Sequence, residues 1–142
     1  MIVFLDACAL IYLIEAKEPC HGQVVAALRD IHQRHPGARL GVSRLSVLEC
    51  LVKPLRDGDQ GLIGDYRAFF ASRDLTLVEI TPAVIESALQ LRARIGLRTP
   101  DAIQAACALA VPDRISLFLT NDSGFKRLDA LTVVVLGEST TI

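Results

Sequence analysis

The chain has 142 residues, of which 51% are hydrophobic and 22% charged, and its formal net charge is -1 at pH 7. With a mean hydropathy of +0.41, this composition excludes a disordered chain, because disordered chains carry too little apolar surface to form a core. The small net charge excludes a global attraction to phosphate, so contact with nucleic acid must come from local basic residues or bound metal. The length predicts one domain over residues 1–142, and the apolar content predicts an extra face that a partner or second subunit covers.

The cysteines and the N-terminal residues indicate the cellular compartment. Cys8, Cys20, Cys50 and Cys107 show no C-x-x-C spacing and lie in or beside apolar helical patterns, which is typical of reduced thiols in a core. The apolar N-terminal run is interrupted by Asp6 before it reaches the length of a signal peptide or a membrane-spanning helix. We therefore expect a cytoplasmic protein without membrane contact.

The elements predicted in the first half begin with a short strand. Residues 2–5 form an apolar run that ends at an acid, which is typical of a strand buried on both faces of a parallel sheet. A helix over residues 45–55 carries an apolar side chain every three or four positions, and this face should point to the core. Its members are Leu45, Leu48, Val52 and Leu55. The other predicted elements are helices over 9–15, 23–34 and 62–72, a strand over 39–43 and a loop over 57–61.

Two helix starts in the second half pair a threonine cap with a proline. Thr81-Pro82 opens a helix that ends at Gly96, and Thr99-Pro100 opens a helix over 101–110. Strands over 75–80, 115–120 and 131–136 and a short helix over 124–128 complete the pattern. The alternation predicts an α/β protein with a central, mainly parallel five-stranded sheet in a three-layer α/β/α arrangement, whose site lies at the carboxyl ends of the strands.

Two acids follow predicted strands. Asp6 comes directly after the first strand, and Asp122 lies two residues beyond the fourth. Either acid alone is explained equally well as a helix cap or turn residue. The carboxyl ends of parallel strands meet at one edge of a sheet. An acid after each of two strands therefore favours a functional site at that edge.

Glu49 lies on the predicted apolar face of the helix over residues 45–55. Burying an unpaired carboxylate costs several kcal/mol or raises its pKa, so an acid on a core face needs an arginine, a hydrogen-bond network or a metal. A structural salt bridge is the alternative to a functional role.

Asp101 lies in the first turn of the helix that Thr99-Pro100 opens, where the helix dipole alone favours an acid. The helix behind it is apolar on nearly every side, and Gln104 is its single polar residue beyond Asp101. Such a helix is buried, so its first turn should open into the interior or a cleft.

Four carboxylates at one edge repel one another, and a hard divalent cation that takes oxygen ligands relieves this repulsion. Mg²⁺ or Mn²⁺ fits, and the predicted ligands are Asp6, Glu49, Asp101 and Asp122. Such an ion keeps water and binds phosphate oxygens, which suits attack of activated water on a phosphodiester. Short polar residues beside the last acid are candidates to orient a ligand, or simple turn formers: Thr120, Asn121 and Ser123.

The order and context of these acids resemble those of the PIN-domain nucleases, and the size and layout resemble the VapC-like toxins of toxin-antitoxin pairs. Similar blocks span nearly the whole chain: Leu5-Asp6 with Leu10-Ile11-Tyr12, Ser43 to Glu49, Thr99 to Ala106, and Thr120-Asn121-Asp122 with Phe125. The resemblance implies a PIN-like fold, Mg²⁺ or Mn²⁺ held by the four acids, endonucleolytic cleavage of RNA, dimerisation, and inhibition by an antitoxin that inserts into the site.

The chain departs from this family just after the first acid, where Ala7 and Cys8 replace the usual Ser, Thr or Asn. The change affects metal preference or rate rather than the reaction class. The alternative function is a catalytically inactive PIN-like module that binds a protein, and the retention of all four acids speaks against it. No G-x-G-x-x-G follows any strand, which argues against a dinucleotide-binding enzyme.

Two further groups of residues are open to two interpretations. Basic residues near the predicted cleft either hold RNA phosphates or are solvated charges: Arg44, Lys53, Arg98, Lys126 and Arg127. Apolar residues of the first half either pack in the core, which is favoured, or form a groove for an antitoxin or dimer: Tyr12, Leu13, Tyr66, Phe69 and Phe70.

Overall fold

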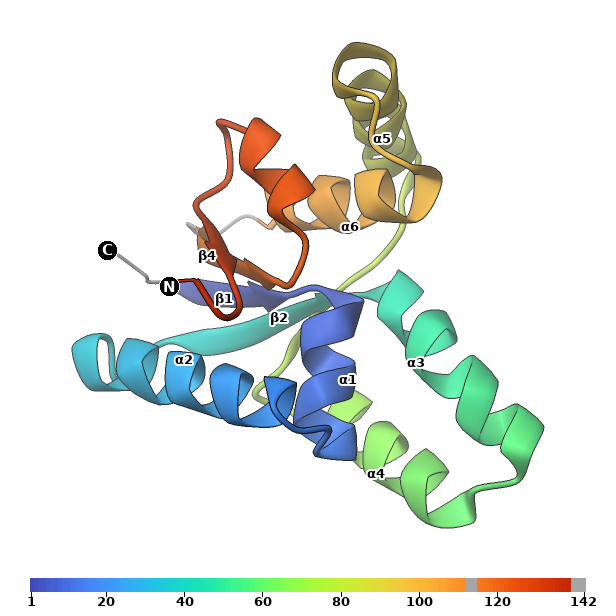
Figure 1. Cartoon of the computed structure of the whole chain (residues 1–142). Helices are drawn as coiled ribbons and strands as arrows, with labels where there is room; N and C mark the ends of the chain where they lie inside the picture. Colours follow the sequence, from blue (N-terminus) through green and yellow to red (C-terminus); the bar gives the residue numbers. More distant parts are fainter. Residues whose placement is uncertain (112–114, 139–142) are drawn as a thin grey trace.

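A five-stranded parallel sheet forms the centre of the computed structural model, which describes residues 1–111 and 115–138 (Figure 1). Its strands are β1 (Ile2–Leu5), β2 (Arg39–Ser43), β3 (Thr76–Val78), β4 (Ile115–Thr120) and β5 (Val133–Val135). They lie in the order β3-β2-β1-β4-β5, and every pairing is parallel, which confirms the predicted fold class. Strands are added on one side of β1 and then on the other, so the crevice at the carboxyl end of β1 is the usual ligand site of such a sheet.

Helices cover both faces of this sheet. Figure 1 shows α1 and α2 on one side and α5 and α6 on the other, while α3 and α4 pack against each other. The longest helix has 15 residues, and within the described ranges no helix combines the length and apolarity needed to cross a membrane. The helices are α1 (Ala7–Glu15), α2 (Cys20–Arg34), α3 (Arg44–Asp57), α4 (Gln60–Phe70), α5 (Pro82–Ile95), α6 (Thr99–Leu109) and the 3₁₀ helix η1 (Ser123–Arg127).

β1 supplies two separate cores, because neighbouring residues of a strand point to opposite faces of the sheet. Ile2 and Phe4 pack with residues of α5 and α6, whereas Val3 and Leu5 pack with residues of α1 and α2. All four side chains are at most 3% exposed, as predicted for a strand buried on both faces. The end of β1 is therefore held in place from above and below.

The five apolar residues of the first half that were open to two interpretations belong to the core on the α1 and α2 side. Tyr66 is fully buried there, and the other four are partly buried against the same cluster. The favoured core-packing interpretation is therefore confirmed for this group.

Local caps make the connection between α3 and α4 shorter than the predicted loop over 57–61. Gly58 ends α3 with a φ of 66°, a left-handed conformation that glycine adopts without strain. Asp59 then caps α4, because its Oδ1 accepts a hydrogen bond from the backbone N–H of Leu62 at 3.1 Å. As a result, α4 begins at Gln60.

The prediction that the apolar stripe of α3 faces the core is wrong. Leu48, Val52 and Leu55 are 65%, 46% and 55% exposed, and Leu45 is half-buried. Periodicity reveals that one face of a helix is apolar, but not what covers it. The buried residues of α3 are instead Ser46, Cys50, Leu51 and Pro54.

Phe118→Ala should lower the free energy of unfolding by about 3–5 kcal/mol, the usual cost of deleting a buried phenyl ring. Phe118 is fully buried, and its ring centroid lies 5.6 Å from that of Phe4 and 4.7 Å from that of Phe125. Urea denaturation measures this loss. Gln90→Ala, on the exposed surface of α5, is the control and should change stability by less than about 0.5 kcal/mol. Equal losses for the two variants would contradict the described core.

Candidate active site

Asp6 lies where the chain leaves β1 and enters α1. Its backbone N–H donates to the carbonyl oxygen of Leu119 at 3.0 Å, which extends the pairing of β1 with β4. Its Oδ1 accepts from the backbone N–H of Ala7 at 2.8 Å and caps α1. Its Oδ2 accepts from the hydroxyl of Thr120 at 2.8 Å. One carboxylate oxygen thus serves the helix, and the other faces the end of β4.

Burial raises the pKa of the Asp6 carboxyl, which is only 8% exposed. The hydrogen bonds from Thr120 and Ala7 favour the charged form and oppose this shift, while the negative charge of Asp101 adds to it. The fold therefore places a carboxylate where its charge is unfavourable.

Asp101 lies in the first turn of α6, with its side chain about one-fifth exposed. The helix begins at Thr99 and its cap residue is Arg98, so Thr99 is not the cap that the sequence predicted. The Nε of Arg98 donates to Oδ2 of Asp101 at 3.3 Å, but the Arg98 side chain is 82% exposed. An ion pair this open to solvent neutralises little of the charge on Asp101.

Glu49 faces α6 even though the apolar stripe beside it on α3 faces solvent. Its Oε1 accepts a hydrogen bond from Nε2 of Gln104 at 3.3 Å. Burial raises the pKa of Glu49, the hydrogen bond from Gln104 opposes the shift, and the charges of Asp6 and Asp101 raise it further. Asp6, Glu49 and Asp101 therefore lie within electrostatic reach of one another. The expectation that brought Glu49 to attention, its place on a core-facing stripe, is wrong.

Asp122 lies at the same edge of the sheet and makes different contacts. Its Oδ1 accepts from the backbone N–H of Gly124 at 2.8 Å and caps η1. Its own backbone N–H donates to the hydroxyl oxygen of Thr120 at 3.1 Å. Thr120 therefore connects the backbone of Asp122 to the carboxylate of Asp6, and the turn role that the sequence left open for Asp122 is present.

The three polar candidates beside Asp122 differ in what they touch. Thr120 is fully buried and contacts the Asp6 carboxylate. Asn121 is exposed, and its Nδ2 donates to the hydroxyl of Tyr12 on α1 at 2.7 Å. Ser123 is exposed at the start of η1 and makes no side-chain hydrogen bond to another described residue. Of these three, Thr120 is the one that contacts an acid.

Sequence reasoning did not include Cys8 and Gln104 in the site. The Sγ of Cys8 lies 3.6 Å from Oδ2 of Asp6 and 3.8 Å from Oγ1 of Thr120, and burial raises the pKa of this thiol to about 12. Gln104 contacts Glu49 as described. Its isolation in an apolar helix was a usable signal, whereas Cys8 had only its position two residues after Asp6.

Basic side chains do not neutralise this group of acids. Among the described residues, one of the four acids forms an ion pair: Asp101 pairs with the exposed Arg98. The other four basic candidates bond elsewhere: Arg44 to Glu79, Lys53 to Asp57, Lys126 to Glu138, and Arg127 to the carbonyl oxygens of Gly124 and Ile95. The repulsion among the acids is therefore not relieved by protein cations in the described part of the chain.

The donor chemistry of these acids fits a hard divalent cation, which prefers oxygen ligands that carry negative charge. As the described side chains are arranged, no three His, Cys, Asp or Glu residues converge closely enough to hold one ion. The acids are thus neighbours rather than a closed ligand set. Oε1 of Gln104 is a further oxygen in this region, buried and without a hydrogen-bond partner among the described residues.

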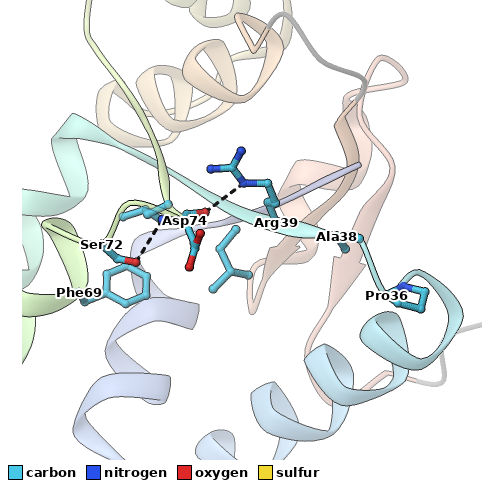
Figure 2. A pocket seen from close by; sticks show the side chains of 9 residues that line it. Pro36, Ala38, Arg39, Phe69, Ser72 and Asp74 are labelled. Carbon is cyan, nitrogen blue, oxygen red and sulfur yellow. Dashed lines mark hydrogen bonds between the residues drawn. The ribbon is translucent and has the colours of Figure 1, made fainter.

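A hollow at the opposite edge of the sheet contains none of these acids. Figure 2 shows it between the start of β2 and the end of α4, lined by residues that include Pro36, Arg39, Phe69 and Asp74. The Nε of Arg39 is held there by the carbonyl oxygen of Asp74 at 3.3 Å. Arg39 and Ser43 are the first and last residues of β2, so the length of this strand separates the hollow from the carboxyl edge.

Several solved structures share this fold. VapBC2 from Rickettsia felis bound to a DNA fragment from its promoter superposes with a TM-score of 0.73 at 15% identity, covering 96% of this chain and 99% of that chain. A toxin-antitoxin complex from Klebsiella pneumoniae gives 0.68 at 20% identity, covering 94% and 96%. VapBC-5 from Mycobacterium tuberculosis gives 0.57 at 15% identity, covering 95% and 98%. At these identities the likeness concerns the fold alone.

The sequence itself matches a family model. A comparison with curated proteins gave no match, but the model described as PIN domain matches residues 3–131, which include all four acids. The resemblance predicted from the sequence is confirmed at this level: the chain belongs to the PIN domain family.

Proposed function

We propose that this chain is a metal-dependent endoribonuclease whose active site consists of Asp6, Glu49, Asp101 and Asp122. One observation carries the proposal: the fold buries the Asp6 carboxylate at the carboxyl edge of the sheet and brings Asp101 and Glu49 within electrostatic reach of it, with no buried basic partner among the described residues. A site with this unrelieved negative charge gains free energy when a cation binds. Mg²⁺ or Mn²⁺ suits carboxylate ligands.

When bound, such an ion supplies a Lewis acid for the phosphate oxygens and lowers the pKa of the attacking water. The chain presents three of these acids from the end of β1, the middle of α3 and the first turn of α6, and the fourth, Asp122, from the turn between β4 and η1. Thr120 orients Oδ2 of Asp6 through a 2.8 Å hydrogen bond. Arg98 contacts Asp101 and is exposed, so it is available to pair with a substrate phosphate.

The toxin role and the RNA substrate rest on resemblance. The size and layout of the chain resemble those of VapC-like toxins, and the superposing structures are described as VapBC or toxin-antitoxin complexes. We therefore propose that RNA is the substrate, that a cognate antitoxin protein is the partner, and that the protein acts in the cytoplasm. The carboxylate site accounts for phosphodiester hydrolysis, and the family resemblance accounts for the choice of RNA.

We also propose that the chain forms a homodimer through exposed apolar residues of α3 and α5. Both helices pack against α6, and their outward faces carry apolar side chains at helical spacing. Apolar side chains that are exposed together on one helix face favour contact with a partner. The residues and their exposed fractions are Leu48 65%, Val52 46%, Leu55 55%, Ile85 47% and Leu89 55%.

Asp6→Asn and Asp101→Asn should each reduce cleavage of RNA by about 10³-fold or more, as expected for removal of a catalytic group. Asparagine keeps the shape of the side chain and can still cap α1 at position 6, so circular dichroism should match wild type. The melting temperature should not fall, because Asp6→Asn removes a charge that burial makes unfavourable. Cleavage of a fluorescent RNA with Mg²⁺ or Mn²⁺ measures the loss.

The matched control for this pair is Asp74→Asn, because Asp74 is exposed at the opposite edge of the sheet. This variant should cleave RNA like wild type. If well-folded wild type cleaves no RNA with either metal, the protein is instead an inactive PIN-like module that binds a protein partner.

Glu49→Gln should stabilise the metal-free protein at neutral pH and weaken Mn²⁺ binding. The pKa of Glu49 is raised above its ordinary value of 4.5 in the folded state, so the folded protein holds this proton more tightly than the unfolded chain does. Stability therefore falls as the pH rises from the ordinary pKa through the raised one. In EDTA the variant and the wild type should melt at the same temperature at about pH 4. Toward about pH 7 the melting temperature of the variant should rise above that of the wild type.

Glu86→Gln, on the exposed surface of α5, is the control and should bind Mn²⁺ like wild type. Saturating Mn²⁺ should reduce or reverse the difference in melting temperature between Glu49→Gln and wild type, because the ion neutralises the charge that the variant lacks. Unchanged melting curves together with unchanged Mn²⁺ affinity would place Glu49 outside the site.

Leu55→Glu combined with Leu89→Glu should weaken self-association by about tenfold or more, since each places a charge in a desolvated contact. Both positions are exposed in one chain, so the fold should be kept. Light scattering over a concentration series measures the change, with exposed Gln90→Glu as the control. A monomeric wild type, or a variant that dimerises equally well, would exclude this interface.

A further inference from the structure

Gln104 is a buried polar side chain in a helix that is otherwise built for the core. It is 1% exposed, and its neighbours on α6 are the fully buried Ala102, Ala105 and Ala108, among others. A primary amide loses its hydrogen bonds to water on burial, so an apolar residue at this position would serve packing better. Its presence requires a reason other than stability.

The amide of Gln104 connects α6 to α3 through two hydrogen bonds. Its Nε2 donates to the hydroxyl oxygen of Ser46 at 3.0 Å and to Oε1 of Glu49 at 3.3 Å. Ser46 is fully buried, and it lies three residues before Glu49, so both face the same side of α3. Ser46 therefore fixes the amide, and the amide in turn fixes the carboxylate.

Neutrality distinguishes this contact from a salt bridge. A lysine or arginine at position 104 would orient Glu49 and also neutralise it, which removes the charge that attracts a metal ion. An amide N–H orients the carboxylate and leaves its net charge intact. This is the kind of outer contact that holds a metal ligand in position.

We propose that Gln104 is a positioning residue that holds the Glu49 carboxylate toward Asp6 and Asp101, with Ser46 as its anchor. The inference rests on the proposed function, because it assigns Gln104 to a site that binds Mg²⁺ or Mn²⁺. The orphaned Oε1 of Gln104 agrees with this assignment. The N–H group of the amide faces Glu49, while its oxygen has no hydrogen-bond partner among the described residues.

Gln104→Met tests the proposal, because methionine has a similar length and no N–H group. Calorimetric titration of the metal-free protein with MnCl₂ should show about tenfold or more weaker binding, as is usual when an outer contact of a metal ligand is lost. Circular dichroism in EDTA should match wild type, and the melting temperature should fall slightly, because the buried hydroxyl of Ser46 loses its partner. Ser46→Ala should weaken Mn²⁺ binding by a smaller factor, since Gln104 keeps its bond to Glu49.

Two comparisons separate positioning from general damage. In a Glu49→Ala background, Gln104→Met should cause no further loss of Mn²⁺ affinity, because its effect acts through Glu49. Tyr66→Phe is the matched control: the hydroxyl of Tyr66 donates to Oε2 of Glu15 at 2.5 Å, so this variant also removes a buried donor to a carboxylate. Glu15 is at the far end of α1 from Asp6, and Tyr66→Phe should bind Mn²⁺ like wild type.

The outcomes distinguish this inference from the proposed function. If the wild type binds Mn²⁺ and the folded Gln104→Met variant binds it equally well, the positioning role is excluded and the proposed function stands. Additive losses for Gln104→Met and Glu49→Ala would likewise exclude an action through Glu49. A wild type that binds no Mn²⁺ overturns the proposed function, and the inference with it.

Discussion

Repulsion among the carboxylates of Asp6, Glu49 and Asp101 is the constraint around which the carboxyl edge of this sheet is organised. The three groups come from the end of β1, from α3 and from α6. Burial raises the pKa of Glu49, and the charges of Asp6 and Asp101 raise it further. Each acid is held by a contact that leaves most of its charge in place: a helix cap and a hydroxyl for Asp6, an amide for Glu49, an exposed arginine for Asp101. The fold thus orients negative charge and does not remove it, which is what a cation site requires.

The buried polar side chains of the protein gather near these carboxylates. Apart from Tyr66 and the cysteines, the buried polar side chains in the described part of the chain belong to this edge of the sheet: Asp6, Ser43, Ser46, Gln104 and Thr120. Ser43 ends β2, caps α3 and bonds to Cys107 of α6, so this serine also joins elements that carry the acids. Elsewhere the two cores are apolar. Polar groups were kept where they position something, and apolar packing supplies the stability around them.

The sequence predicted the sheet, its parallel strands and the order of its helices, because short apolar runs and proline-led helix starts are local signals. It did not predict the direction of the α3 stripe. Periodicity showed that Leu48 and Val52 share a face, but only the packing of α3 on its neighbours shows that this face is outside. Glu49 was therefore singled out for a reason that the structure does not support. Cys8 contacts Thr120, and Ser46 contacts Gln104, through tertiary packing, which local sequence patterns do not reveal.

The central place of β1 has a consequence for the stability of the site itself. β1 has four residues, it packs into both cores, and the amide of Asp6 extends its ladder to Leu119. Amide hydrogens in such a position exchange with solvent only when the whole domain unfolds, so Asp6 belongs to the last region to open. Asp122 lies in a short turn between β4 and η1, where opening is local and costs less free energy. The acids thus differ in rigidity: Asp6 is fixed as firmly as the fold itself, whereas Asp122 can move while the domain stays folded.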